Sequence, residues 1–428
     1  NVSVKQVDPN DNWTLGTGTT FGNNLVNITQ GGNVLEQSGG IFVSGKKFKI
    51  QYTISNYVSG SIAVSNVSPT TYFNSNGIYS YDVVGAGGNF KYFSSGFNGS
   101  ITDISVIEIQ ENGVPRLDYT NGTASILLEP QSTNELYYSN DFSNSNWQKL
   151  SGASVSADRV LSPEGINNAW QINFDGTSNA RIEQARTGMT NGADYTVSLY
   201  ARVKSGTQQI EFGSITTASY ILNTEWQRIT RTEAENDTTS YSRIVCASAN
   251  TIELYAFQLE KKSFATSYIP TTSGSTITRA AETLNNAGNS DLINSTEGVL
   301  YAEIAALSDD GTNRLLSLSD GTSTNRIFLG FNSLSNSIRF RVQVNNVYQA
   351  ENNFIVADTT QYLKIGFKFK ENDFALWING VEVLVDNSGS TFSSNTLNKL
   401  SFDSGVGGSP LYGKCKTVAV FKEALSDT

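Results

Sequence analysis

The chain has 428 residues and a formal net charge of −10, and only 16% of its residues are charged. It shows neither a basic stripe with interleaved aromatics nor an apolar run near the roughly 20 residues of a membrane span, which excludes nucleic acid as a partner and membrane insertion. Histidine is absent, so the Ser-His-Asp and Cys-His catalytic systems and the commonest zinc ligand are excluded too.

Residues 1–111 form the first predicted unit. The stretch "KKFKIQYTIS" places Phe48, Ile50 and Tyr52 on one face of a strand. Turn residues separate such alternating runs about every ten positions, which indicates a jelly roll or another β-sandwich.

Residues 134–262 repeat the order of these signals. Asn12–Trp13 and Asn146–Trp147 each precede a Gly-containing turn, and strands such as "KKFKIQYTIS" and "DYTVSLYARVKSG" follow. The repeat predicts two copies of one jelly-roll type. An early Trp, a central alternating strand and a closing alternating strand resemble the jelly rolls of carbohydrate-binding modules.

Two segments without a period-2 face join the units, at residues 112–133 and 263–290. The second is rich in Ser and Thr and contains Pro270, so it favours an extended run over a domain surface. We expect a stiff spacer, with an ordinary surface loop as the alternative. Three residues are expected to anchor it: Tyr268, Ile269 and Ile277.

The third predicted unit spans residues 291–428. Asn379–Gly380 stands between the apolar runs "FALWI" and "VEVLV", and Asn-Gly in this setting predicts a β-hairpin. The order of strands, the "LWING" hairpin and the closing "VAVFKEALSD" resemble a concanavalin-like (laminin-G-like) lectin sandwich. Such domains usually continue for a few more residues, so we expect this unit to be incomplete at its C-terminal end. The predicted fold is all-β, with three tandem jelly-roll or β-sandwich domains in series.

Motifs in the two connectors resemble those that flank jelly rolls in tail and appendage proteins of tailed bacteriophages. The matching stretches are "PRLDY" (115–119), "LLEP" (127–130), "TN" (133–134), "SNDF" (139–142), "ATSYIP" (265–270) and "TRAA" (278–281). The family pattern ends on Asp where this chain has Glu282. The resemblance implies a structural tail-fibre or head-fibre component on the outside of a virion. It implies other virion proteins as partners and a homo-oligomer, with a trimer favoured.

Sugar binding needs aromatic platforms among neutral hydrogen-bonding groups, and the first unit offers a cluster of tyrosines among Asn and Ser. The candidate ligand-binding residues are Tyr72, Tyr79, Tyr81 and Tyr92. Some of these positions alternate strictly, which leaves a core role open. All five tryptophans are expected in the core: Trp13, Trp147, Trp170, Trp226 and Trp377.

Several carboxylates are candidates for catalysis or for metal binding. A glycosidase needs two carboxylates flanking the scissile bond, whereas Glu303 stands alone in "YAEIAAL" and Glu382 lies in the Asn-Gly hairpin. We therefore expect no catalytic residues and no enzyme. Asp309 and Asp310, with Asp403, could supply oxygen ligands to a structural Ca²⁺, although acidic residues at turns are more often turn formers. No other cofactor is expected.

The predicted function is to space and present β-sandwich modules for adhesion to polysaccharide on a host surface. Two alternatives stay open. The modules could belong to a secreted or virion-borne enzyme that degrades polysaccharide, or the chain could be a bacterial secreted adhesin. A purely structural role without glycan binding is the simplest reading.

Overall fold

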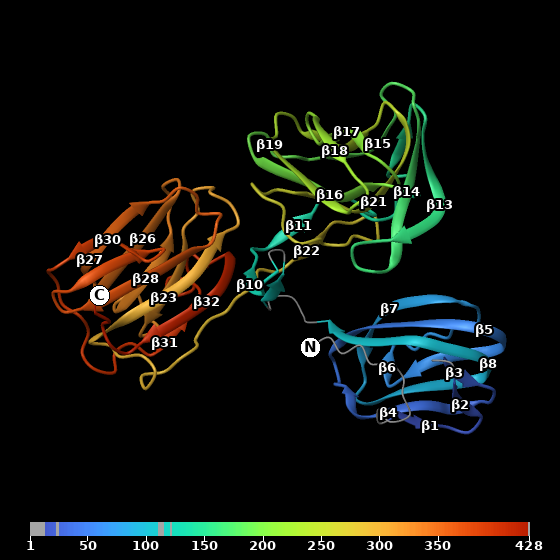
Figure 1. Ribbon diagram of the computed structural model, residues 1–428, viewed down its shortest axis with the longest axis horizontal. Coiled ribbons are helices and arrows are strands. Elements are labelled where there is room, and N and C mark those ends of the chain that lie inside the picture. The colour runs from blue at the N-terminus through green and yellow to red at the C-terminus, as the bar shows by residue number, and fades with distance from the viewer. Residues whose placement is uncertain (1–12, 23–24, 110–114, 120–121, 427–428) are drawn as a thin grey trace. The chain divides into compact units, whose positions relative to one another are not determined.

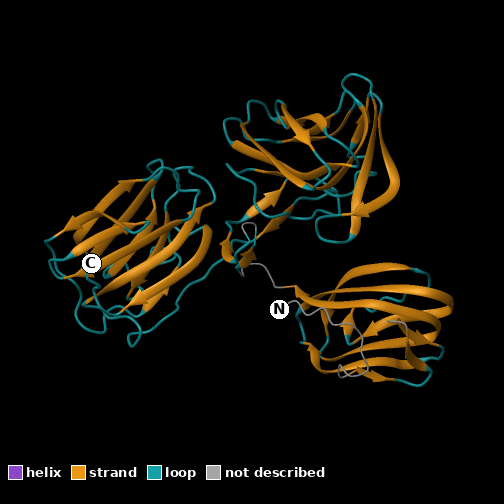
Figure 2. Cartoon of the chain, viewed as in Figure 1, coloured by secondary structure: helices purple, strands orange, loops and turns teal. Residues whose placement is uncertain are grey.

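A computed structural model describes residues 13–22, 25–109, 115–119 and 122–426. Every regular element in these ranges is a β-strand (Figure 2), which confirms the all-β prediction. Consequently the described part of the chain contains no helix that is long and apolar enough to cross a bilayer. Two compact units result, Asn1–Asn112 and Gly113–Thr428, and the second contains two sandwiches.

The first unit is one hydrogen-bonded sheet that folds back on itself (Figure 1). Its two longest strands, β5 (Lys47–Ser65) and β8 (Gly88–Ile109), pair along most of their length with three shifts in register, two of which flank residues 59–61 of β5. Gly60 lies between these two shifts with φ of 76°, and a Cβ there would lie 2.1 Å from the Gly96 carbonyl oxygen. Only glycine allows this close backbone approach. The other strands are β1 (Trp13–Leu15), β2 (Thr19–Gly22), β3 (Leu25–Ile28), β4 (Gly32–Phe42), β6 (Val67–Ser68) and β7 (Gly77–Gly85).

The core of the first unit draws side chains from both halves of the long strands. The predicted face of β5 is confirmed, because Phe48, Ile50 and Tyr52 are all buried. The C-terminal half of β5 adds Ile62 and Val64 to the same core. Alternation of apolar residues therefore sets the inward face, as period 2 requires.

The middle sandwich packs two five-stranded antiparallel sheets around one core. One sheet has the order β12-β15-β20-β17-β18 and the other β13-β14-β21-β16-β19. The strands are β12 (Gln148–Leu150), β13 (Ala153–Leu161), β14 (Asn167–Asp175), β15 (Arg181–Thr187), β16 (Asp194–Val203), β17 (Gln208–Gly213), β18 (Ala218–Leu222), β19 (Gln227–Ala234), β20 (Thr239–Val245) and β21 (Ala249–Glu260).

The predicted internal repeat does not extend to topology. The first unit has the order β1-β4-β8-β5-β7-β6 in one sheet, whereas the middle sandwich separates its strands into two sheets. The shared signals are turn residues and alternating strands, which many sandwiches have in common. Similar local chemistry in the same order therefore did not specify the same connections.

The third sandwich packs a seven-stranded sheet against a five-stranded sheet. The orders are β30-β29-β28-β23-β32-β10-β9 and β27-β26-β25-β24-β31. Asn379 and Gly380 have φ of 52° and 83° and join β29 to β30, as the hairpin prediction requires. The strands are β23 (Glu297–Ala306), β24 (Arg314–Ser319), β25 (Arg326–Phe331), β26 (Ser337–Val344), β27 (Val347–Ile355), β28 (Leu363–Lys370), β29 (Phe374–Ile378), β30 (Val381–Asp386), β31 (Lys399–Ser401) and β32 (Gly413–Phe421).

The segment 112–133, expected to be an extended connector, supplies two strands of the third sandwich. β9 (Arg116–Asp118) and β10 (Ser125–Leu128) form a hairpin, and β10 pairs with β32. The middle sandwich is thus an insertion in the sequence of the third. β11 (Ser132–Asn134) leads into it and β22 (Ile277–Arg279) leads out, and these two strands pair with each other (Figure 1).

The Ser/Thr-rich connector is extended but not free. This stretch lies on the outer face of one sheet of the middle sandwich, the one with the order β13-β14-β21-β16-β19. As a result it buries Thr266, Ile269 and Thr271. The Gln258 amide on that face accepts from the Ile269 N–H at 2.6 Å and donates to the Thr266 carbonyl at 3.2 Å. Of the expected anchors, Tyr268 and Ile269 pack against the sandwich, whereas Ile277 is 42% exposed.

Candidate functional site

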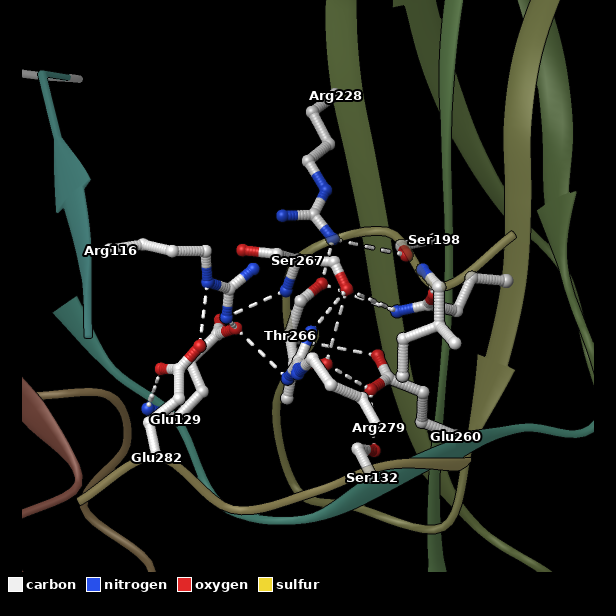
Figure 3. Close-up of polar contacts among 12 residues, drawn as sticks. Arg116, Glu129, Ser132, Ser198, Arg228, Glu260, Thr266, Ser267, Arg279 and Glu282 are labelled. Carbon is white, nitrogen blue, oxygen red and sulfur yellow. Dashed lines mark hydrogen bonds and ion pairs between the residues drawn. The ribbon is translucent and has the colours of Figure 1, made fainter. Parts of the chain in front are cut away.

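Charged residues of the connector motifs meet in one buried network, called here the junction network: Arg116, Glu129, Arg279 and Glu282. Arg116 donates to Glu282 through Nε at 2.7 Å and also pairs with Glu129 (Figure 3). Arg279 lies 2.9 Å from the same Glu129 carboxylate, and the Glu129 N–H donates to Glu282 at 2.7 Å. Residues that are distant in sequence therefore fix β10 beside the paired strands β11 and β22.

Burial makes this network sensitive to the loss of any member. The carboxylates of Glu129 and Glu282 are almost fully buried, and a buried charge is costly unless it is paired. Burial acts to lower the pKa of Arg116, but Glu129 and Glu282 together raise it above its ordinary value. For Arg279, burial prevails and the pKa is lowered. The network therefore has a structural role: it ties the end of β10 to the segment around β22.

A second cluster holds the connector on the middle sandwich. The Glu260 carboxylate accepts from the Thr266 N–H at 2.9 Å, from the Thr266 hydroxyl, and from the Ser132 hydroxyl at 2.6 Å (Figure 3). The Asn134 amide donates to the Ile269 carbonyl at 2.9 Å. Threonine and serine hydroxyls therefore satisfy the buried groups that a period-2 strand would pair in a ladder.

An aromatic groove of about 330 Å³ lies on the third sandwich, on the face of the seven-stranded sheet away from the core. Tyr301 on β23 stands opposite Gly366 on β28, and Gly366 stands opposite Trp377 on β29. Directly opposed residues share one face, so two aromatic rings flank a floor that has no side chain. Its lining residues are Val299, Tyr301, Gly366, Lys368, Trp377, Phe421, Leu425 and Ser426.

The polar groups of the groove are few and defined. The Lys368 ammonium lies 5.4 Å from the centre of the Trp377 ring and 2.7 Å from an Asp373 carboxylate oxygen. Burial, with Glu303 nearby, raises the pKa of the Tyr301 phenol, so this hydroxyl stays protonated at neutral pH. The groove combines flat apolar walls with the Lys368 ammonium and the hydroxyls of Tyr301 and Ser426.

The sequence prediction missed this groove because it assigned Trp377 to the core. In "FALWI" the core residues are Phe374, Leu376 and Ile378, so Trp377 is on the opposite face and only half-buried. The same alternation places Tyr301 outward, between Leu300 and Ala302. Strict period-2 reading of both strands would have found the pair.

The four tyrosine candidates of the first unit do not form one surface. Tyr92 is fully buried and packs on Tyr52, with ring centres 5.1 Å apart. It is a core residue, and its side chain leaves no face for a sugar. Tyr79 and Tyr81 are half-buried and also lie against Tyr52. Tyr72 is 51% exposed and makes no ring contact within the described residues.

The acidic candidates are engaged by protein groups. Asp310 makes a bidentate pair with Arg314, at 2.6 and 2.8 Å. Asp309 accepts from the Asn336 N–H at 3.0 Å and from the Ser335 hydroxyl at 2.5 Å. Within the described ranges, no group of three or more Asp, Glu or Cys side chains is arranged to hold a metal ion. Both aspartates therefore stabilise turns and loops through these hydrogen bonds and the ion pair.

Glu303 and Glu382 lie on the same sheet but on β23 and β30, with β28 and β29 between them. Three strand spacings of about 4.8 Å put their backbones roughly 14 Å apart. Glu303 also pairs with Lys416 at 3.5 Å, so a lysine of the chain itself engages its carboxylate.

No family model and no curated protein sequence matches the chain. One similar solved structure is described as "CBM4 structure and function", with 20% identity and a TM-score of 0.24 over 29% of this chain and 94% of that chain. Another is the CBM22-1-CBM22-2 tandem domain of Xyn10C from Paenibacillus barcinonensis, with 10% identity and a TM-score of 0.27 over 61% and 97%. A third is the pair of domains LG4-5 of the mouse laminin alpha1 chain, with 9% identity and a TM-score of 0.25 over 65% of this chain and 96% of that chain. Such low scores assign no function, and the description of the fold rests on the sheets themselves.

Proposed function

We propose that this chain is a non-catalytic glycan-adhesion protein, built as an external appendage component of a tailed phage. The observation that carries adhesion is the aromatic groove, in which Tyr301 and Trp377 flank Gly366 on an exposed sheet face. A sugar ring presents apolar C–H groups on its faces and hydroxyls on its edge. The flat rings at the walls suit the apolar faces, and the Lys368 ammonium beside the Trp377 ring suits the hydroxyls.

The middle sandwich supports a structural role rather than adhesion. Its outer sheet face is covered by its own connector, where Tyr268 packs on Tyr255 with ring centres 5.8 Å apart. The Trp226 indole donates to the Leu161 carbonyl at 3.1 Å, which closes a further part of that face. This face of the middle sandwich is therefore filled by the chain's own side chains.

The appendage role is supported by the connector motifs. Arg116, Glu129 and Arg279 belong to the motifs that resemble tailed-phage appendage proteins, and these residues build the junction network with Glu282. Under this proposal the partners are host-surface polysaccharide and other virion proteins. A homo-oligomer, with a trimer favoured, would multiply weak sugar contacts into avidity.

The groove is tested by presenting the full-length chain multivalently on an array of host and capsular glycans. We expect Trp377→Ala to abolish binding, and Gly366→Val to weaken it at least tenfold by filling the floor. A Cβ at Gly366 meets only the Trp377 Cβ, at 3.9 Å, so the larger side chain should not disturb the sheet. Tyr348→Ala removes an exposed aromatic from β27 in the other sheet and is the matched control.

Three outcomes would contradict the proposal. Retention of glycan binding by both groove variants would remove the groove from the function. Release of reducing sugar from capsular polysaccharide by the pure chain would contradict the non-catalytic role and favour the enzyme alternative. Failure of gold-labelled antibody to decorate any virion would contradict the appendage role, while leaving adhesion to be judged by the array.

A further inference from the structure

A polar pocket of about 340 Å³ lies among loops of the third sandwich, apart from the aromatic groove. This loop pocket is formed by the segment before β23, the loop after β24, strand β31 and the glycine-rich loop that follows it. The side chains that define it are Asn285, Asn286, Lys399, Ser401 and Asp403. No aromatic residue lines it.

The sequence "DSGVGG" builds the mouth of the pocket. The Gly405 N–H donates to Asp403 Oδ1 at 2.6 Å, and the Ser404 N–H donates to the Gly408 carbonyl at 2.7 Å. Gly405 has φ of 88°, and a Cβ there would lie 2.9 Å from Ser319. Only glycine permits this turn to lie on β24, and the turn holds the Asp403 carboxylate at the pocket wall.

Asp403 is the unusual member. Its side chain is only 3% exposed, and within the described residues no cation lies within ion-pair distance. Oδ1 accepts from the Gly405 N–H of the turn. Oδ2 accepts no hydrogen bond among the described residues and is not one of the fully buried atoms that lack a partner, so it stays accessible from the pocket. A largely buried carboxylate that can be reached from a pocket favours a ligand with hydrogen-bond donors.

The other lining groups complement this carboxylate. Lys399 is half-buried at the pocket and forms no ion pair with a described carboxylate. Asn285 accepts from the Phe402 N–H at 3.2 Å through Oδ1, which leaves its NH₂ group as a donor. One anion, one cation and an amide donor give a pocket of zero net charge, rich in hydrogen-bonding groups. The positive charge of Lys399 disfavours a metal cation in the pocket, and the negative charge of Asp403 disfavours an anion.

We propose that the loop pocket binds one uncharged terminal sugar residue through its hydroxyls. Asp403 accepts from two neighbouring hydroxyls, while Lys399 and Asn285 donate to other oxygens of the same sugar. The volume is at the small end of ligand sites and suits one residue rather than a chain. This inference rests on the proposed glycan adhesion and adds a second, chemically different subsite to it.

The test uses the full-length chain and saturation-transfer NMR with glucose, galactose, mannose and N-acetylglucosamine. We expect at least one sugar to bind, and Asp403→Asn to weaken that binding at least tenfold. This variant can keep the turn because an amide oxygen still accepts from Gly405. Lys399→Met should weaken binding as well. Asp320→Asn makes the same charge change at a nearby turn outside the pocket lining and should leave binding unchanged.

Several outcomes would overturn the inference. These are no saturation transfer to any of the four sugars, or equal binding by wild type and Asp403→Asn when both show the same melting temperature. Asp403-dependent binding of glycine or of Ca²⁺ without any sugar would assign the pocket to another ligand class. Trp377→Ala separates this inference from the proposed function: monosaccharide binding that survives Trp377→Ala but not Asp403→Asn supports the pocket even if the groove fails.

Discussion

Arg116 and Glu282 are 166 positions apart in the sequence, yet Nε of Arg116 lies 2.7 Å from Oε1 of Glu282. One residue precedes the middle sandwich and the other follows it. Their contact closes the insertion at its base, beside the paired strands β11 and β22. The third sandwich and the root of the middle sandwich therefore depend on the same few charges.

Arg116→Ala should destabilise this junction by about 3 kcal/mol, the lower end of the range for breaking a buried ion pair, because Arg116 itself is a third exposed. The physical reason is that Glu129 and Glu282 would be left buried with less positive charge. Hydrogen exchange of the β10 and β22 amides measures the local effect. The exposed pair Lys46–Glu108 is the control, and Lys46→Ala should change stability by less than about 1 kcal/mol. Equal protection of β10 in wild type and Arg116→Ala would show that the network does not hold the junction.

A fragment of residues 291–428, the bounds that the sequence predicts for the third unit, should fold poorly. It lacks β10, whose Leu128 belongs to the core, and it leaves β32 as an unpaired edge. A chain that joins residues 115–131 to 280–428 through a linker of about four residues should fold. Ser132 and Arg279 are directly opposed in the β11–β22 pair, where opposed Cα atoms lie about 5 Å apart, so a short linker can replace the middle sandwich. Circular dichroism and thermal melting compare the two. A cooperative melt for the shorter fragment at the temperature of the longer one would contradict this account.

The fold could be predicted from the sequence wherever one period-2 face is buried. Phe48, Ile50 and Tyr52 were assigned correctly because alternation alone sets which face of a strand meets the core. Strand partners could not be predicted in this way. β10 pairs with β32 across nearly the whole second unit, and no local signal specifies a partner so distant in sequence.

The candidate sites show the same division. Tyr92 and Trp377 both stand in alternating strands, but one faces the core and the other faces away from it. Residue type alone does not show which of the two faces the core. The position of each in the alternation, relative to the neighbouring core residues of its strand, does show it. Asp403 could be singled out as an oxygen ligand, yet its environment depends on Asn285 and Lys399, which the fold brings together. Pockets made of several loops have no sequence period to reveal them.

Tyr92→Phe should leave the first unit unchanged or stabilise it by about 1 kcal/mol. The Tyr92 hydroxyl is buried and has no hydrogen-bond partner among the described residues, so its removal relieves an unsatisfied polar group. Tyr92→Ala should cost about 3–5 kcal/mol because it opens a cavity. Urea unfolding of both variants tests the pair of expectations. A clear loss of stability in Tyr92→Phe would show that a buried water satisfies this hydroxyl.

Glu233 should make the middle sandwich less stable in acid. Burial acts to raise the pKa of this carboxyl, but hydrogen bonds from Arg231 and Thr216 prevail and lower it to about 2 from an ordinary value of 4.5. A depressed carboxyl pKa gives stability that is fully present above about pH 4.5 and is lost as the pH falls towards 2. Glu233→Gln should therefore flatten the pH dependence of β19 amide protection in this window, whereas Glu225→Gln, at an exposed carboxyl, should not. A variant as acid-sensitive as wild type would assign the loss to other groups.

Neither cysteine should react with Ellman's reagent in the native protein. Cys246 and Cys415 are both free and buried; burial raises the pKa of the Cys246 thiol and raises that of Cys415 to about 11. The thiolate is the reactive form, so a buried thiol with a raised pKa is both inaccessible and unactivated at pH 8. Two thiols per chain should appear only after denaturation. Comparison of Cys246→Ala with Cys415→Ala assigns any labelling of the native protein to one of the two sandwiches. Rapid labelling of Cys415 would mean that β32 separates from β10 or β23 in the native state. That result would contradict a junction that holds these strands together.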